Sequence, residues 1–268
     1  MIQERLKALR AEMEKRGITV YVVPTADFHE SEYVGDHFKA RKFITGFTGS
    51  AGTAVITLDE AGLWTDGRYF VQAENQLKDS TVTLYRMGEE GVPTVDEFVK
   101  DRLKEGGCLG FDGRVVNGTW GGRLEKIAAE KNVSMHVTED LIDLIWEDRP
   151  ALSKQPLFIL EEKYSGKSTA DKIGDLRKAM KENGADVHIL TSLYDIAWLL
   201  NIRGNDIHCC PVVLSYLVLD DSELRLFVNE KAFSDSVKEA LSKDGIAIYP
   251  YDDIYTYCLL YTSPSPRD

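Results

Sequence analysis

The chain has 268 residues, the length of about two domains at roughly 100–200 residues each. Its composition, with 43% hydrophobic and 28% charged residues, supports a buried core and excludes a disordered chain. A net charge of −12 lacks the basic surface that nucleic acids and anionic membranes bind, so we expect neither as a partner.

The start of the chain and its cysteines indicate a cytoplasmic protein. Residues 1–5 open directly into a helical pattern, without the basic and then apolar stretch of a signal peptide. No run of apolar residues approaches the ~18 that a membrane span requires. The four cysteines, at positions 108, 209, 210 and 258, form no CxxC pair and no disulfide framework, which fits a reducing compartment.

Helices and strands alternate over the first part of the chain. Periodicity predicts helices at 3–16, 69–77, 94–103 and 117–131, strands at 20–24, 53–58, 63–65, 81–85 and 108–111, and a mixed segment at 40–47. Gly17 ends the first helix, and Thr94, with Glu97 three residues later, is a predicted N-cap. Asp66 and Gly67 give a hairpin-type turn signal after the third strand. The alternation indicates an α/β fold.

A short polar stretch between Pro150 and Pro156 marks a predicted domain boundary. We therefore expect a first domain over residues 1–150 and a second over 151–257. After a strand at 246–249 we expect no further complete helix before residue 258, where the last segment begins, so the second domain is predicted to be truncated.

The second block repeats the pattern of the first. Residues 9–20 read LRAEMEKRGITV, and residues 176–187 read LRKAMKENGADV. In both copies a helix, a glycine stop and a buried strand are expected, with the strands at 20–23 and 187–190. This repeat indicates duplicated α/β domains.

The last eleven residues, 258–268, read CLLYTSPSPRD and differ in character from the rest. Back-translated, they can be written as a transposase sequencing adapter read in frame. We expect the natural sequence to stop near Tyr257, and we set the segment aside from the fold. The alternative is a natural linker rich in serine and proline.

Three partial motifs each lack a required residue. A nucleophile elbow needs glycine where Thr48 stands, a P-loop needs glycine where Glu161 stands, and a zincin helix needs histidine where Tyr33 stands. His188 lies in an expected strand and is interpreted as a core residue, and His208 lies on an expected loop beside two cysteines. The sequence therefore predicts no metal site within this chain.

The segment 43–70 is the richest in candidate function. It carries glycines at 46, 49, 52, 62 and 67, which permit close backbone approach and positive φ. A tight loop there could leave backbone N–H groups pointing into a cleft. Ordinary hairpin chemistry is the alternative.

Five segments, in the same order, resemble the signature segments of the three-domain Xaa-Pro aminopeptidases, the aminopeptidase P family. They are residues 29–33, 46–53, 64–70, 145–150 and 195–204. The resemblance runs from residue 3 to about residue 255. It implies two tandem creatinase-like N-terminal domains, each a mixed sheet flanked by helices. In that family a pita-bread catalytic domain follows, and this sequence does not include it.

The resemblance also implies an activity for the parent protein. Members remove the first residue from peptides with proline in second position, using two divalent cations, usually manganese. Their ligands are two Asp, two Glu and one His on the pita-bread domain, so no catalytic residue and no metal ligand can be carried over to this chain. The fragment is thus expected to bind no cation and to be inactive alone, while it supplies cleft and oligomerisation surfaces, most simply in a homodimer.

One functional residue carries over from the family, the arginine of the WTDGRYF segment, here Arg68. The resemblance implies that Arg68 binds substrate and that Asp66 supports it, with Trp64 and Phe47 as packing residues. The alternative is a local surface pair between Arg68 and Asp66. Cys210 departs from the family, which usually carries asparagine at this position.

Two other functions stay open at this point. The chain could be a free-standing, non-catalytic module for binding or dimerisation. It could also belong to a creatine amidinohydrolase, which uses the same architecture without metal. The WTDGRYF segment and the tandem domains favour the peptidase.

Overall fold

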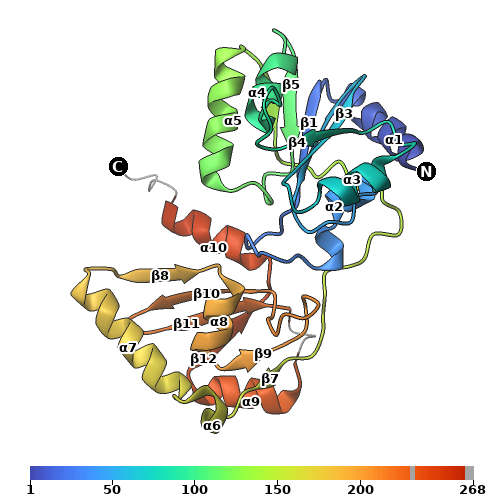
Figure 1. Cartoon of the computed structure of the whole chain (residues 1–268). Helices are drawn as coiled ribbons and strands as arrows, with labels where there is room; N and C mark the ends of the chain where they lie inside the picture. The colour runs from blue at the N-terminus through green and yellow to red at the C-terminus, as the bar shows by residue number, and fades with distance from the viewer. Residues whose placement is uncertain (230–232, 263–268) are drawn as a thin grey trace, which may run out of the picture. The chain divides into compact units, whose positions relative to one another are not determined.

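The chain folds into two compact units, and the boundary between them along the chain lies between Ala151 and Leu152 (Figure 1). The computed structural model describes residues 1–229 and 233–262, with side chains to residue 259. Each unit is a mixed sheet with helices against it, which confirms the predicted fold class. The expected adapter segment lies outside the described residues from 263 onward.

Unit 1 (Met1–Ala151) holds a six-stranded sheet of order β4-β3-β2-β1-β5-β6. Its elements are α1 (Ile2–Lys15), β1 (Val20–Pro24), η1 (Asp36–Phe38), α2 (Ala40–Thr45), β2 (Thr53–Thr57), β3 (Ala61–Thr65), α3 (Phe70–Leu77), β4 (Thr83–Arg86), α4 (Val95–Arg102), β5 (Cys108–Phe111), α5 (Gly118–Glu130) and β6 (Ser134–His136). Strand β2 is antiparallel to both β1 and β3, whereas the other neighbouring pairs are parallel. The start of β2 therefore shares an edge with the ends of β1 and β3.

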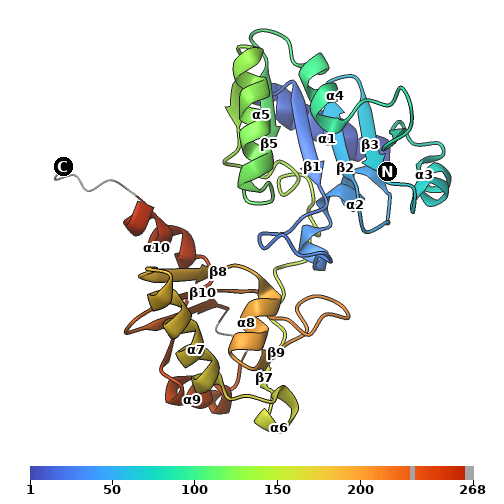
Figure 2. The ribbon, with the colours of Figure 1, turned by 60° about the vertical axis from the view of Figure 1, so that its left-hand side comes forward.

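Both faces of the unit 1 sheet are covered (Figure 2). Tyr21 and Val23 of β1 pack into a core that includes residues of α1, α2 and α3. Val20 and Val22 pack on the opposite face with residues of α4 and α5. Because neither face of β1 meets water, the strand reads as a continuous apolar run in the sequence.

Helix α4 begins as the sequence predicts. Thr94 accepts a hydrogen bond from the backbone N–H of Glu97 at 3.2 Å, and the Glu97 carboxylate accepts one from the Thr94 N–H at 2.8 Å. This reciprocal pair is a capping box, which satisfies two donors at the start of the helix.

Unit 2 begins at Leu152 and holds a four-stranded sheet of order β12-β11-β10-β8, beside a small β7-β9 pair. Its elements are β7 (Phe158–Ile159), α6 (Glu162–Ser165), α7 (Thr169–Glu182), β8 (Val187–Leu190), α8 (Leu193–Leu199), β9 (Ile202–Arg203), β10 (Ser215–Asp220), β11 (Leu224–Val228), α9 (Asp235–Lys243), β12 (Ile246–Tyr249) and α10 (Asp253–Thr262). One face of this sheet packs on α7, α8 and α9.

The predicted repeat is present as α1–β1 and α7–β8, but its second strand was expected to be buried, and this is wrong. Gly17 and Gly184 both follow their helices with φ near +65° (+66° and +65°), a conformation that glycine adopts without strain. Strand β8 pairs only with β10 and is an edge strand, so Ile189 is 45% exposed and His188 is half-buried rather than a core residue.

Helix α10 follows β12, and only its first five residues, 253–257, precede the segment 258–268 that was set aside from the fold. Aromatic contacts to the sheet hold residues 251–257: the rings of Tyr216 and Tyr251 lie 5.2 Å apart, and those of Phe227 and Tyr257 lie 5.5 Å apart. Ile254 is buried as well. Nothing in the sequence between residues 253 and 262 is proline or glycine, so no residue there breaks a helix.

The described cysteines all carry free thiols, and Cys210 is buried whereas Cys209 is exposed. Among the helices that the structure describes, none has the length and apolar character of a membrane span.

The capping box gives a test of the unit 1 fold. Replacing Thr94 by alanine removes the acceptor for the Glu97 N–H and should lower the free energy of unfolding by about 1 kcal/mol. Urea denaturation followed by tryptophan fluorescence measures this loss. The Thr94→Ser variant keeps the oxygen and should unfold close to the wild type. An equal loss in both variants would contradict the role of the hydroxyl.

Candidate functional site

The candidate site lies at the edge of the unit 1 sheet where β2 starts and β3 ends. The loop 46–52 joins α2 to β2, and the turn 66–69 joins β3 to α3. Thr53 pairs with Trp64 across these strands, so the loop and the turn are neighbours. The turn was expected at the tip of a hairpin, and this is wrong: β3 runs parallel to β4, and the chain crosses over through α3.

The loop and the turn are joined by side-chain contacts. The Ser50 hydroxyl and the Tyr69 hydroxyl lie 2.7 Å apart, within hydrogen-bond distance. The rings of Phe47 and Tyr69 meet edge to face with centroids 5.9 Å apart. From α3, Gln76 accepts a hydrogen bond from the Thr48 N–H at 2.8 Å and donates another to the Thr48 hydroxyl at 2.8 Å. These contacts make the loop and the turn one hydrogen-bonded block.

Two glycines of the loop are required by close approach. A Cβ at Gly49 would lie 2.2 Å from the Phe47 ring and 2.8 Å from the Tyr69 ring. A Cβ at Gly52 would lie 2.8 Å from the Trp64 carbonyl oxygen, and Gly52 has φ +155°. The glycines that drew attention to this segment thus allow the loop to pack flat against the turn.

Arg68 and Asp66, the two predicted site residues, lie together on the turn. Arg68 Nε donates to Asp66 Oδ1 at 2.8 Å, and Arg68 Nη2 donates to Asp66 Oδ2 at 2.9 Å. The Arg68 side chain is 69% exposed, and its Nη1 donates to no acceptor among the described residues. The ion pair therefore fixes the direction of the guanidinium and leaves one side of its planar fork available.

The ion pair shifts the acidity of both partners. Hydrogen bonds from Arg68 lower the pKa of the Asp66 carboxyl to about 2, and the Asp66 carboxylate raises the pKa of Arg68 in turn. Trp64 and Phe47 are fully buried, Trp64 stacked on Tyr85 with ring centroids 4.1 Å apart, so both are packing residues. The role of Arg68 toward a substrate stays a prediction.

Arg41 is a site residue that the sequence analysis missed. It lies on α2, is 3% exposed, and donates to Thr25 Oγ1 at 2.9 Å and to the carbonyl oxygens of Phe47 and Gly49. Burial lowers the pKa of Arg41 to about 10, so the guanidinium stays protonated at neutral pH. The signal in the sequence was weak: an arginine in a short mixed segment.

Two of the other signature segments, 145–150 and 195–204, make hydrogen bonds that join parts of the fold. Segment 195–204 contains the end of α8, and Lys172 of α7 binds there. Lys172 donates to the Trp198 carbonyl at 2.7 Å and to Asn201 Oδ1 at 2.6 Å. Arg203 donates to the Ala197 carbonyl at 2.6 Å. Cations that bind the last carbonyls of a helix stabilise its end.

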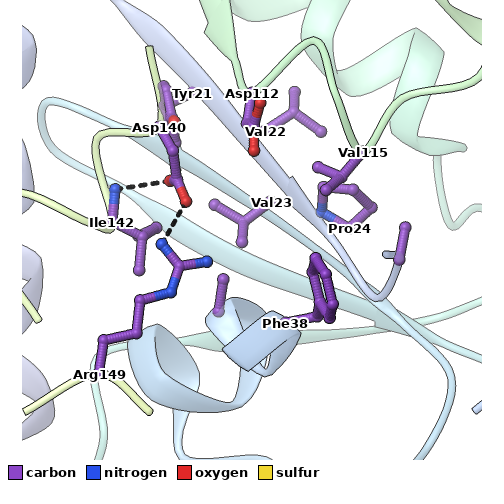
Figure 3. Close-up of a pocket in the computed structure, with 12 residues that line it drawn as sticks. Tyr21, Val22, Val23, Pro24, Phe38, Asp112, Val115, Asp140, Ile142 and Arg149 are labelled. Carbon is purple, nitrogen blue, oxygen red and sulfur yellow. Dashed lines mark hydrogen bonds and ion pairs between the residues drawn. The ribbon is translucent and has the colours of Figure 1, made fainter. Parts of the chain in front are cut away.

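Segment 145–150 closes unit 1 around a small cavity of about 20 Å³ (Figure 3). Arg149 donates to Asp140 Oδ2 at 2.6 Å and to the His37 carbonyl at 3.0 Å. Burial raises the pKa of Asp112, whose side chain also lines the cavity. A cavity of this size holds about one water molecule and is too small for a peptide.

The histidines are dispersed. His37 Nδ1 lies 2.8 Å from the Pro150 carbonyl oxygen, His136 Nε2 lies 3.3 Å from Glu139, and His208 is exposed on a turn. No group of three or more His, Cys, Asp or Glu side chains within the described parts of the chain is arranged to hold a metal ion.

The fold is a pair of α/β modules, and the first carries a glycine-rich loop beside an exposed, oriented arginine. Sequence models described as the creatinase/prolidase N-terminal domain match residues 5–145 and 148–265. The chain belongs to this family.

The similar proteins carry related names. The chain is 42% identical over 255 residues to a protein of Sordaria macrospora named Probable Xaa-Pro aminopeptidase P, covering 94% of this chain and 41% of that protein. It is 37% identical to Xaa-Pro aminopeptidase 1 of Dictyostelium discoideum, covering 96% and 42%.

A solved structure has the same fold over nearly the whole chain. It is the X-prolyl aminopeptidase of Caenorhabditis elegans, described as a cytosolic enzyme with a di-nuclear active site, at 32% identity and a TM-score of 0.91. The match covers 97% of this chain and 44% of that one. The chain thus spans about two fifths of the length of these relatives.

The Asp66–Arg68 pair gives a pH test. The pKa of Asp66 should be about 2, below its ordinary 3.8, so the ion pair is complete above about pH 4 and is lost as pH falls through 2. Carboxyl ¹³C shifts measured against pH report this titration. In Arg68→Gln the pKa of Asp66 should rise toward 3.8, whereas that of Asp59, lowered by Thr57, should not move. An unchanged Asp66 would show that the pair does not form in solution.

Proposed function

We propose that this chain is the N-terminal part of an aminopeptidase that removes the first residue from peptides with proline in second position. The observation that carries the proposal is the 42% identity to a protein of that name, which extends over 94% of the chain and so over both units. The C. elegans neighbour, whose name indicates the same bond specificity, supports it independently through its fold.

The bond in question has two chemical features. Proline makes the scissile amide tertiary and removes its N–H, so a recognition surface cannot use that donor. The substrate instead offers carbonyl oxygens as hydrogen-bond acceptors. Arg68 matches this need, because its Nη1 group is not used by Asp66 and the ion pair fixes its orientation. We propose Arg68 as a substrate-binding residue and Asp66 as its support.

Two divalent cations, by the same proposal manganese, would supply the hydrolytic chemistry of the whole protein. The described residues of this chain do not fit them, since no three ligand-type side chains converge. The ions would be bound by residues outside this sequence, in agreement with the di-nuclear active site named for the C. elegans enzyme.

Location and assembly follow the same proposal. A cytoplasmic location is supported by the description of the neighbour as a cytosolic enzyme. A homodimer is proposed from the resemblance to the aminopeptidase P family. The alternative of a free-standing binding module stays open, whereas the relatives' names favour a peptidase over creatine amidinohydrolysis.

The chain alone should be inactive. Incubated with manganese and the peptide Ala-Pro-Ala, it should release no alanine above the rate of the buffer, because it lacks a cation site among its described residues. Amino-acid analysis of the supernatant measures release. Manganese-dependent release that grows with chain concentration would overturn the assignment of the chemistry to residues outside this sequence.

A chimera tests Arg68 directly. This chain would replace the matching part of the Dictyostelium enzyme, to which it is 37% identical over 265 residues. Loss of a charged hydrogen bond in Arg68→Ala should lower kcat/KM by roughly tenfold to a hundredfold. The matched control is Arg102→Ala, an arginine paired with Glu60 at the opposite edge of the same sheet, which should keep kcat/KM. Equal kcat/KM in the Arg68→Ala chimera and its parent would remove Arg68 from the site.

A further inference from the structure

Four carbonyl groups of the glycine-rich loop 46–52 accept hydrogen bonds from the rest of unit 1. Those of Phe47 and Gly49 accept hydrogen bonds from Arg41. The Ala51 carbonyl accepts one from the Thr65 hydroxyl at 2.8 Å, and the Gly52 carbonyl accepts two from Thr25, at 3.0 Å from its N–H and 2.8 Å from its hydroxyl. These carbonyl oxygens are therefore already hydrogen-bonded within unit 1.

The N–H groups of the same loop are not used in this way. Those of Ser50 and Ala51 donate to no acceptor among the described residues, Ser50 is exposed and Ala51 is half-buried, whereas the neighbouring Gly49 is buried. Backbone N–H groups need acceptors, and successive free ones form sites for negatively polarised oxygen atoms. The loop thus presents donors next to the turn that carries Arg68.

Arg41 is the residue that produces this arrangement. Its guanidinium has no carboxylate partner among the residues described, and its bonds go to three neutral oxygens in different directions. It also lies over the Phe47 ring, 4.7 Å from the ring centroid, and Phe47 in turn contacts Tyr69. The planar guanidinium of arginine can donate to several acceptors that lie in different directions. The ammonium group of lysine is a compact point charge and spans a smaller distance.

We infer that Arg41 is a positioning residue of the substrate edge: by binding the carbonyls of Phe47 and Gly49 inside, it presents the N–H groups of Ser50 and Ala51, beside Arg68, to main-chain carbonyl oxygens of a bound peptide. This inference rests on the proposed function and extends it. It assigns the glycine-rich loop as a second donor set and predicts that recognition there is independent of substrate side chains.

The experiment uses the whole 268-residue chain, labelled with ¹⁵N, and the peptide Ala-Pro-Ala-Ala-amide at millimolar concentration. In the wild type, peptide addition should shift the amide resonances of Ser50 and Ala51 together with the side-chain resonance of Arg68. Arg41→Lys keeps the charge but loses the span of the fork. Peptide binding should be weaker, with a dissociation constant raised by roughly tenfold, which is the effect of one to two charged hydrogen bonds.

The matched control is Arg102→Lys, since Arg102 also lies over a phenylalanine ring, 4.6 Å from the Phe98 centroid, but at the opposite edge. It should bind the peptide like the wild type. Melting temperatures of all variants are measured, and binding is compared where each is folded. A role limited to stability would lower the melting temperature of Arg41→Lys and leave the dissociation constant unchanged, which would overturn the inference.

The remaining outcomes separate the two proposals. Peptide-induced shifts at Arg68 without shifts at Ser50 and Ala51 would overturn the loop assignment and leave the proposed role of Arg68 intact. Shifts at neither the turn nor the loop would overturn both. Shifts at both places, reduced together in Arg41→Lys, are the expected result.

Discussion

The reversed direction of β2 is the constraint on which the candidate site depends. It lies between β1 and β3, antiparallel to both, so its first residue, Thr53, pairs with the last part of each neighbour, Pro24 and Trp64. The loop that precedes β2 and the turn that follows β3 consequently meet at one edge. A parallel β2 would place the glycine-rich loop at the far edge of the sheet, and no contact between Ser50 and Tyr69 could form.

Both units use a buried cation to organise carbonyl groups rather than to balance a carboxylate. Arg41 holds the loop before β2, and Lys172 holds the end of α8, each with neutral oxygens as its acceptors. Removing a charged group from water costs several kcal/mol, and here hydrogen bonds to several oxygens offset that cost. Because those oxygens would be left without donors if the cation were lost, each cation determines the shape of a connection between elements.

The sequence was most informative where structure is local. The capping box at Thr94 and the nearness of Asp66 to Arg68 involve residues two or three positions apart, and local patterns predict such pairs. Whether a strand is central or at an edge depends on pairing with distant residues, so β8 read like β1 although its neighbours differ. Arg41 was missed for the same reason, since its burial depends on how residues 47–49 and Thr25 converge around it.

The charge of Arg68 affects which peptides the loop and turn beside it can bind. Asp66 already balances that charge, so on a chain of net charge −12 the exposed guanidinium contributes oriented donors rather than a strong positive field. A peptide with proline in second position has lost a main-chain donor at that residue and kept its carbonyl acceptors. Under the proposed function, a surface that offers Arg68 Nη1 and the loop N–H groups complements this imbalance, because these groups are donors and the peptide backbone offers acceptors. Specificity at this edge would then follow from the hydrogen-bonding pattern of the peptide backbone, and side-chain preference would have to arise elsewhere.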